Sequence, residues 1–120
     1  MISERDELHL ACILDSIELI GGYVAGDKRR FEQETVVQDA VLRRLETLAD
    51  AAGKLPPTPR NRHPEIPWRA VQDFHNVAAP AYTGIDLEVV WQIVVSDLPP
   101  LRKVVAGELR AARRGRQADR

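Results

Sequence analysis

The spacing of apolar residues constrains the fold of this chain more than any other feature. Between residues 10 and 24, apolar side chains recur at steps of three and four, which places them on one face of a helix. The same spacing returns within residues 31–52, 68–78, 87–94 and 101–109. No stretch alternates convincingly with the period of two that a half-buried strand requires. The pattern predicts an all-α protein, an up-and-down bundle of four to five helices with short connections.

Small polar residues and prolines predict where these helices begin and end. Ser3, with Asp6 three positions later, resembles a capping pair, and Asp27 and Asp86 are placed to cap two later helices. We expect the helix that begins after Asp27 to be continuous and to end at Gly53 in a left-handed conformation. We also expect the proline pair at residues 99–100 to break the helical run. A last helix is expected to begin at this break and to fray at its C-terminal end.

Length and charge favour one domain in a reducing compartment. The chain has 120 residues, a net charge of −1 and a single cysteine, Cys12, so residues 1–120 form one domain with no internal disulfide and no thiolate cluster for zinc. No run approaches the length of a membrane span, so the prediction is a cytoplasmic protein without membrane contact. Residues 110–120 carry five arginines. Such a basic tail suits either RNA phosphates or, more commonly, a solvated and disordered terminus.

The connection between the second and third helical stretches is rich in proline. Residues 54–67 contain five prolines, which predicts a stiff extended segment. Arg60, Arg62 and His63 form its dense basic group. If the protein binds RNA, phosphate contacts are expected there; otherwise these side chains keep the connection solvated.

Residues 67–82, PWRAVQDFHNVAAPAY, hold the candidate site. Pro67 suits the first turn of a helix, whereas Pro80 would clash with the carbonyl of Asn76 and bend or stop it. The polar residues near this bend are His75, Asn76 and Tyr82. On spacing alone the signal is weak, because a lone histidine is more often a hydrogen-bonded surface residue than an acid or base. There is no glycine-rich phosphate loop, no set of cysteines and histidines at metal-ligand spacing, and no dinucleotide signature, so no cofactor is expected.

Two strings in the second half of the chain resemble one known family. HPEIPWRAVQDFHN at residues 63–76 and AYTGIDLEVVWQIVVSDLPPLR at residues 81–102 are similar to the HepT-like members of the HEPN superfamily. The earlier segments YVAGDKRRF and QDAVLRRLETLADAA are similar to the family's second helix. The likeness extends from about residue 14 to residue 105.

The resemblance implies a function and partners. Such proteins are helical two-fold homodimers, and the first long helices or residues 67–82 would form the dimer contact here. They serve as the toxin half of a toxin–antitoxin pair whose other half is a small MNT-type nucleotidyltransferase. Their activity is metal-independent endoribonuclease cleavage of RNA, without a cofactor.

The family motif is Arg, a polar residue, three further residues, His, any residue and Tyr. On this chain these positions hold His75, Asn76, Pro80 and Tyr82. The resemblance therefore implies a weakened or inactive ribonuclease, because Pro80 cannot transfer a proton and His75 is a cation only when protonated. The replacement of these two residues is compatible with natural degeneration and with deliberate inactivation.

The motif tyrosine is retained, and two other functions stay open. In the family this hydroxyl receives AMP from the nucleotidyltransferase, which would place a negative charge on the RNA site. The alternative for Tyr82 is a half-buried residue at a helix end. For the whole chain, the alternatives to a toxin are a catalytically silent helical partner of the nucleotidyltransferase and a helical adaptor unrelated to RNA.

Overall fold

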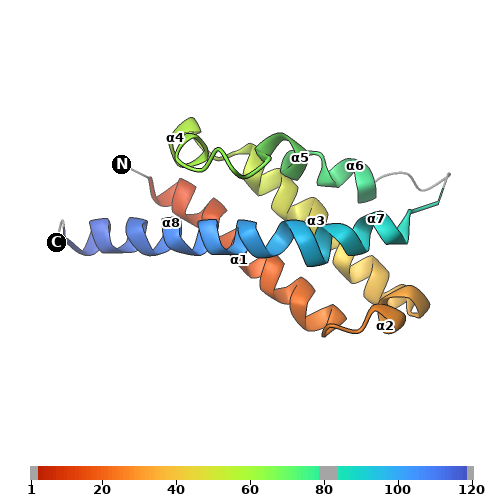
Figure 1. The fold of residues 1–120 in the computed structure, drawn as a ribbon. Coiled ribbons are helices and arrows are strands. Elements are labelled where there is room, and N and C mark those ends of the chain that lie inside the picture. Colours follow the sequence, from red (N-terminus) through yellow and green to blue (C-terminus); the bar gives the residue numbers. More distant parts are fainter. Residues whose placement is uncertain (1–2, 79–83, 119–120) are drawn as a thin grey trace.

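The computed structural model describes residues 3–78 and 84–118, and every regular element within these two stretches is helical. Three long helices form the body, α1 (Glu4–Val24), α3 (Thr35–Gly53) and α8 (Leu98–Ala118). α1 packs against both α3 and α8. Figure 1 shows α8 running along the long axis of a body that measures 50 × 24 × 22 Å. The predicted all-α fold is confirmed.

The first helix forms as the sequence predicts. The Ser3 hydroxyl accepts a hydrogen bond from the backbone N–H of Asp6 at 3.1 Å, which satisfies one of the donors left unpaired at a helix start. The apolar face of α1 is buried between α3 and α8. Its buried apolar residues are Leu10, Ile13, Ile17, Ile20 and Val24.

The second helical stretch is interrupted, which corrects the prediction of one continuous helix. The Asp27 side chain caps α2 (Lys28–Gln33) as predicted, but Glu34 has extended backbone angles, φ −103° and ψ 107°, and α3 begins after it. The amide of Gln38 donates to the carbonyls of Phe31 at 2.9 Å and Glu32 at 3.1 Å. These bonds satisfy carbonyls that the end of α2 leaves without helical partners. They therefore lower the free-energy cost of interrupting the helix.

The predicted left-handed glycine at the end of α3 is wrong. Gly53 is the last residue of the helix, and in the described part of the chain positive φ values occur at Ala25, Gly26 and Gly84. Lys54, which follows, keeps a right-handed conformation, and its N–H bonds back to the carbonyls of Ala51 and Ala52.

The proline-rich connection is more compact than the extended segment predicted. Residues Pro57–Asn61 form a short helix, α4, and Leu55, Pro59 and Ile66 are buried. Prolines in a first helical turn have no N–H that would need a partner, which is why this composition permits α4.

The described part of the stretch expected to hold the site, residues 67–78, forms two short helices. Pro67 precedes α5 (Trp68–Gln72), and α6 (Phe74–Ala78) follows after Asp73. Asp73 has φ −80° and ψ −3°, and its N–H bonds to the carbonyls of Arg69 and Ala70 at 3.1 Å. α5 and α6 both pack on α3.

The proline pair does not break the last helical stretch. α7 (Leu87–Gln92), capped by Asp86 as predicted, passes through a π-helical turn, η1 (Ile93–Asp97), directly into α8. Figure 1 shows α7 and α8 along one line. Pro99 and Pro100 would leave two carbonyls unpaired in a regular helix and would clash with them. The wider π turn just before them, in which the N–H of Leu98 bonds to the carbonyl of Ile93, accommodates both rings.

The basic end of the chain is helical as far as Ala118, further than the sequence predicts. Arg116 lies 2.8 Å and Arg113 lies 3.5 Å from the carboxylate of Glu7 on α1. This contact holds the last turns of α8 against the first turn of α1.

Candidate functional site

His75 and Asn76 lie next to each other in the first turn of α6, and both are exposed. Nδ1 of His75 lies 2.7 Å from the backbone carbonyl of Gln72. A carbonyl oxygen only accepts, so this bond requires the proton on Nδ1 and leaves Nε2 as the nitrogen that can contact a ligand. This bond to the backbone thus fixes the orientation of the His75 ring.

A groove of about 690 Å³ lies beside His75, between α3 and the two short helices. α3 contributes Arg43 and Asp50, the residue after it is Lys54, and α5 contributes Gln72. Lys54 pairs with Asp50 at 3.0 Å. The groove therefore carries charges of both signs and is not a simple phosphate cradle.

Pro80 and Tyr82, the other two motif positions, lie outside the described residues. The structure places His75 and Asn76, the predicted first half of the motif, on an exposed helical turn beside the groove. Any role for Pro80 and Tyr82 stays a prediction.

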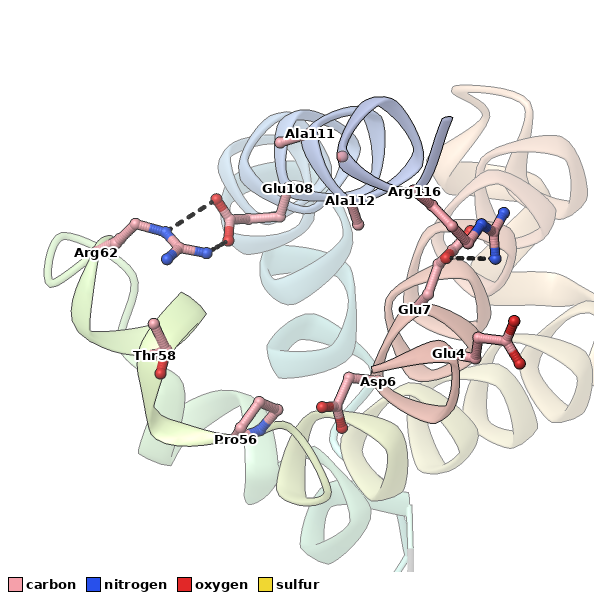
Figure 2. A pocket seen from close by; sticks show the side chains of 11 residues that line it. Glu4, Asp6, Glu7, Pro56, Thr58, Arg62, Glu108, Ala111, Ala112 and Arg116 are labelled. Atoms are coloured by element: carbon pink, nitrogen blue, oxygen red, sulfur yellow. Dashed lines mark hydrogen bonds and ion pairs between the residues drawn. The ribbon is translucent and has the colours of Figure 1, made fainter. Parts of the chain in front are cut away.

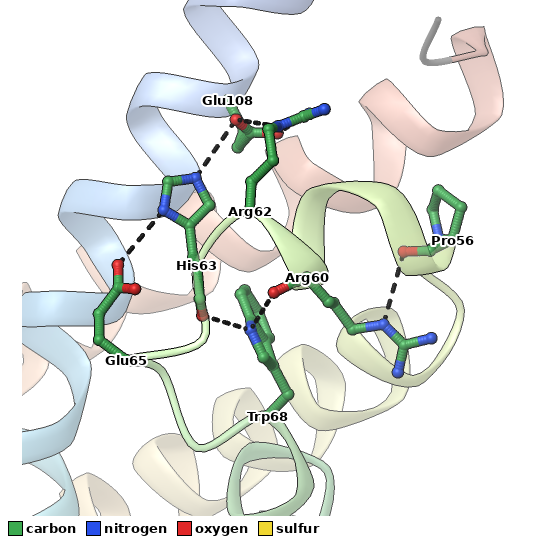
Figure 3. A network of polar contacts seen from close by, with 7 residues as sticks. All are labelled: Pro56, Arg60, Arg62, His63, Glu65, Trp68 and Glu108. Carbon is green, nitrogen blue, oxygen red and sulfur yellow. Dashed lines mark hydrogen bonds and ion pairs between the residues drawn. The ribbon is translucent and has the colours of Figure 1, made fainter.

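The basic residues predicted to meet RNA take part in a polar network that joins the connection to α8 (Figure 3). Nε2 of His63 lies 3.3 Å from Glu108, and its Nδ1 lies 3.3 Å from Glu65. Arg62 binds the same Glu108 carboxylate through two nitrogens, one of them Nε at 3.3 Å. The Arg60 guanidinium turns the other way, with Nε 3.5 Å from the carbonyl of Pro56.

The indole of Trp68 fixes the backbone of this connection. Its Nε1 donates to the carbonyls of Arg60 at 3.1 Å and His63 at 3.0 Å. The three basic residues are thus close in space, but Arg62 and His63 already share one carboxylate.

Glu108 was not predicted as part of any site. Its side chain is only 11% exposed, and burial alone would raise the pKa of its carboxyl. Hydrogen bonds from Arg62 and His63 outweigh burial, and the pKa of Glu108 lies below its ordinary value. The sequence signal for a special role of Glu108 was its position as an acid within an otherwise basic helix. Its partners could not be predicted, because Arg62 and His63 lie 46 and 45 residues away in the sequence.

A hollow of about 750 Å³ lies between α1, α4 and α8 (Figure 2). The ion pair of Arg62 with Glu108 lines one side, and the pair of Arg116 with Glu7 lines the other. It shares no lining residue with the groove at His75.

The described residues include neither a cluster of potential metal ligands nor a helix suited to span a membrane. Residues 3–78 and 84–118 contain no group of three or more histidine, cysteine, aspartate or glutamate side chains that could hold a metal ion. Within the same residues, no helix combines the length and apolar content that crossing a membrane requires.

Comparisons with known proteins agree on one family. The model of the family described as "Ribonuclease HepT-like" matches residues 13–107. A protein of Thermococcus cleftensis named "Probable ribonuclease HepT" is 34% identical over 97 residues, which cover 78% of this chain and 86% of that protein. No solved structure matches the chain at a significant level.

A longer relative comes from Methanocaldococcus jannaschii. It is named "Gamma-glutamylcyclotransferase and putative RNase", and it is 35% identical over 101 residues. The match covers 82% of this chain but only 45% of that relative, so this chain spans less than half of its length. The family match and the Thermococcus relative together establish the family: the chain belongs to the HepT-like ribonucleases of the HEPN superfamily.

Proposed function

We propose that this chain is the toxin component of a HepT/MNT-type toxin–antitoxin module, a metal-independent endoribonuclease of the cytoplasm whose activity is weakened at two motif positions. The match to the ribonuclease family over residues 13–107 carries the proposal. The exposed position of His75 beside the groove supports it, because a group that contacts a large substrate such as RNA must be accessible.

The weakening follows from the chemistry of the two replacements. Cleavage of RNA without a metal needs a base for the 2′-hydroxyl, an acid for the leaving oxygen and a cation for the charge that develops on phosphorus. Arginine is a permanent cation with a planar set of donors, whereas His75 offers Nε2 and is charged only when protonated. Pro80 has no group that transfers a proton.

A homodimer would bring two copies of the motif into one cleft. One chain offers a single histidine within the motif, and two chains would offer a pair for acid and base roles. In this proposal Arg60 contributes to RNA binding directly, whereas Arg62 and His63 contribute after exchanging Glu108 for phosphate. The partner is an MNT-type nucleotidyltransferase, which would modify Tyr82.

Restoration of the motif tests the proposal. RNA cleavage is measured, with a chelator present, for the unaltered chain, for His75→Arg, for Pro80→His and for the double variant. General acid–base groups contribute about 10²- to 10⁴-fold, so the double variant should cleave at least about a hundredfold faster than the unaltered chain. Equal and strong cleavage by the unaltered chain would refute the weakening.

Cleavage by the same variants, together with complex formation with the nucleotidyltransferase, distinguishes a ribonuclease from the second candidate function. A silent partner protein would form a stable complex with the nucleotidyltransferase, and no member of the variant series would cleave RNA. Absence of both cleavage and complex formation would leave the helical adaptor.

A further inference from the structure

α8 carries a line of cations on the face that points away from the bundle. Lys103, Arg110 and Arg114 are spaced by seven and four residues, so with 3.6 residues per turn they lie on one face. All three are exposed, whereas Leu101, Val105 and Leu109 on the opposite face are buried.

The neighbouring face of α8 is basic as well, but acids of α1 neutralise it. Arg102 lies 3.2 Å from Glu18, and Arg113 and Arg116 both contact Glu7. Within residues 3–78 and 84–118, no carboxylate lies within ion-pair distance of Lys103, Arg110 or Arg114. Glu108 is the only acid in the sequence of α8, and it is occupied by Arg62 and His63.

A small hollow of about 440 Å³ opens beside Lys103, between α8 and the connection that contains His63. Ile66 and Val104 supply apolar wall, and Gly107 leaves the side facing the line of cations without a side chain. The ring of His63 also lines this hollow, between Glu65 and Glu108 (Figure 3). An apolar hollow with an imidazole at its wall suits a nucleobase taken out of its stack.

We infer that this face of α8 is an accessory binding site for single-stranded RNA, with phosphates along Lys103, Arg110 and Arg114 and one base in the hollow over Gly107. The inference rests on the proposed function for its ligand, since a ribonuclease meets RNA. The four-residue step from Arg110 to Arg114 covers about 6 Å of helix axis, which is short enough for two phosphates of one strand.

The face favours RNA over an anionic membrane surface. A helix that lies on a membrane needs large apolar residues to insert beside its cations. The exposed large apolar residues of the described structure are Leu8, Leu19, Val36, Val89 and Val95, and none of them belongs to α8.

The site is separate from the motif. α6, which carries His75, packs on α3, and the groove at His75 shares no lining residue with the hollow at Lys103. The accessory site therefore contributes affinity for RNA without contacting the bond to be cleaved.

Binding of a labelled oligouridylate to the full chain, measured by fluorescence anisotropy from about 50 to about 200 mM salt, tests the phosphate line. Arg110→Ala with Arg114→Ala should weaken binding about tenfold at the lowest salt. Each lost single-strand phosphate contact should reduce the slope of log K against log salt by about 0.7, so the pair reduces it by about 1.4. Arg29→Ala with Arg44→Ala removes the same net charge from α2 and α3 and should change neither quantity.

A second pair of variants tests the hollow. A Cβ at Gly107 meets nothing closer than a guanidinium nitrogen of Arg110 at 4.0 Å, so Gly107→Leu adds a side chain at the wall of the hollow and narrows it without a clash with the backbone. It should weaken binding severalfold and leave the salt slope unchanged, because it removes a base contact and no charge. Gly115→Leu, on the same helix but lining the hollow of Figure 2, should bind as the unaltered chain does.

The outcomes separate this inference from the proposed function. Equal losses in the Arg110/Arg114 and Arg29/Arg44 pairs, or no loss in either, would overturn the accessory site even if the restored motif cleaves RNA. Loss of binding to anionic vesicles in the Arg110/Arg114 pair, with RNA affinity unchanged, would overturn it in favour of a membrane. Loss of oligonucleotide binding by that pair, without cleavage by His75→Arg/Pro80→His, would support the site and refute the proposed ribonuclease.

Discussion

The carboxylate of Glu7, in the first turn of α1, lies 2.8 Å from the guanidinium of Arg116, in the last turns of α8. The Glu7 side chain is 11% exposed, whereas that of Arg116 is 46% exposed. The acid is thus held in the interface and the arginine reaches to it from the surface. This contact joins the two ends of the chain and explains why the basic terminal segment is helical.

Glu7→Gln should lower the free energy of unfolding by about 1 kcal/mol, because a partly buried pair is worth more than an exposed one and Arg113 loses the same partner. Amide hydrogen exchange should quicken in residues 110–118 and hardly change in α3. Glu4→Gln removes the same charge from an exposed position at the start of the same helix and is the control. Equal exchange in both variants would show that the Glu7 contacts do not hold the end of α8.

Replacement of Glu108 should change how stability depends on pH. Its pKa is lowered in the folded state, so ionised Glu108 stabilises the fold above the unfolded pKa, near 4.5, and this stabilisation is lost as the pH falls below that value through the lowered folded pKa. Glu108→Gln should therefore be less stable than the unaltered chain near neutral pH, and the difference should shrink in acid. Urea denaturation at a series of pH values measures this, and a difference that grows in acid would contradict it.

The three capped helix starts and the apolar faces were predictable because they depend on neighbours a few residues apart. Ser3, Asp27 and Asp86 accept hydrogen bonds from backbone N–H groups two or three residues ahead. The break at Glu34 was not predictable from local spacing, because it accompanies the reach of Gln38 back to the carbonyl of Phe31, seven residues away.

The position of the candidate site is a prediction from motif spacing, whereas its surroundings could not be predicted from the sequence. A motif at fixed spacing places His75 without knowledge of the fold. The walls of its groove come from α3, more than twenty residues earlier, and Glu108 meets Arg62 across 46 residues. Such contacts depend on how the helices pack, which a one-dimensional pattern does not encode.

Modification of Tyr82 is the prediction closest to regulation. Incubation of the chain with an MNT-type nucleotidyltransferase and ATP should raise its mass by one or more AMP units. The chain has two tyrosines, so Tyr82→Phe should abolish the shift and Tyr23→Phe, on α1, should keep it. A shift that survives in Tyr82→Phe and disappears in Tyr23→Phe would refute the assignment.

An aromatic contact between Phe31 and Trp91 holds α2 against α7. The rings of Phe31 and Trp91 lie 5.6 Å apart between centroids, inclined by 34°, and Phe31 is fully buried. Phe31→Ala removes this aromatic pair and leaves a cavity, so it should lower the free energy of unfolding by about 3 to 5 kcal/mol. Phe31→Leu, which refills most of the space, should cost clearly less. Urea denaturation measures both, and because the site at His75 belongs to α6, any cleavage by the restored motif should survive in Phe31→Leu. Equal destabilisation by the two variants would mean that the aromatic contact, and not the filled volume, dominates at this position.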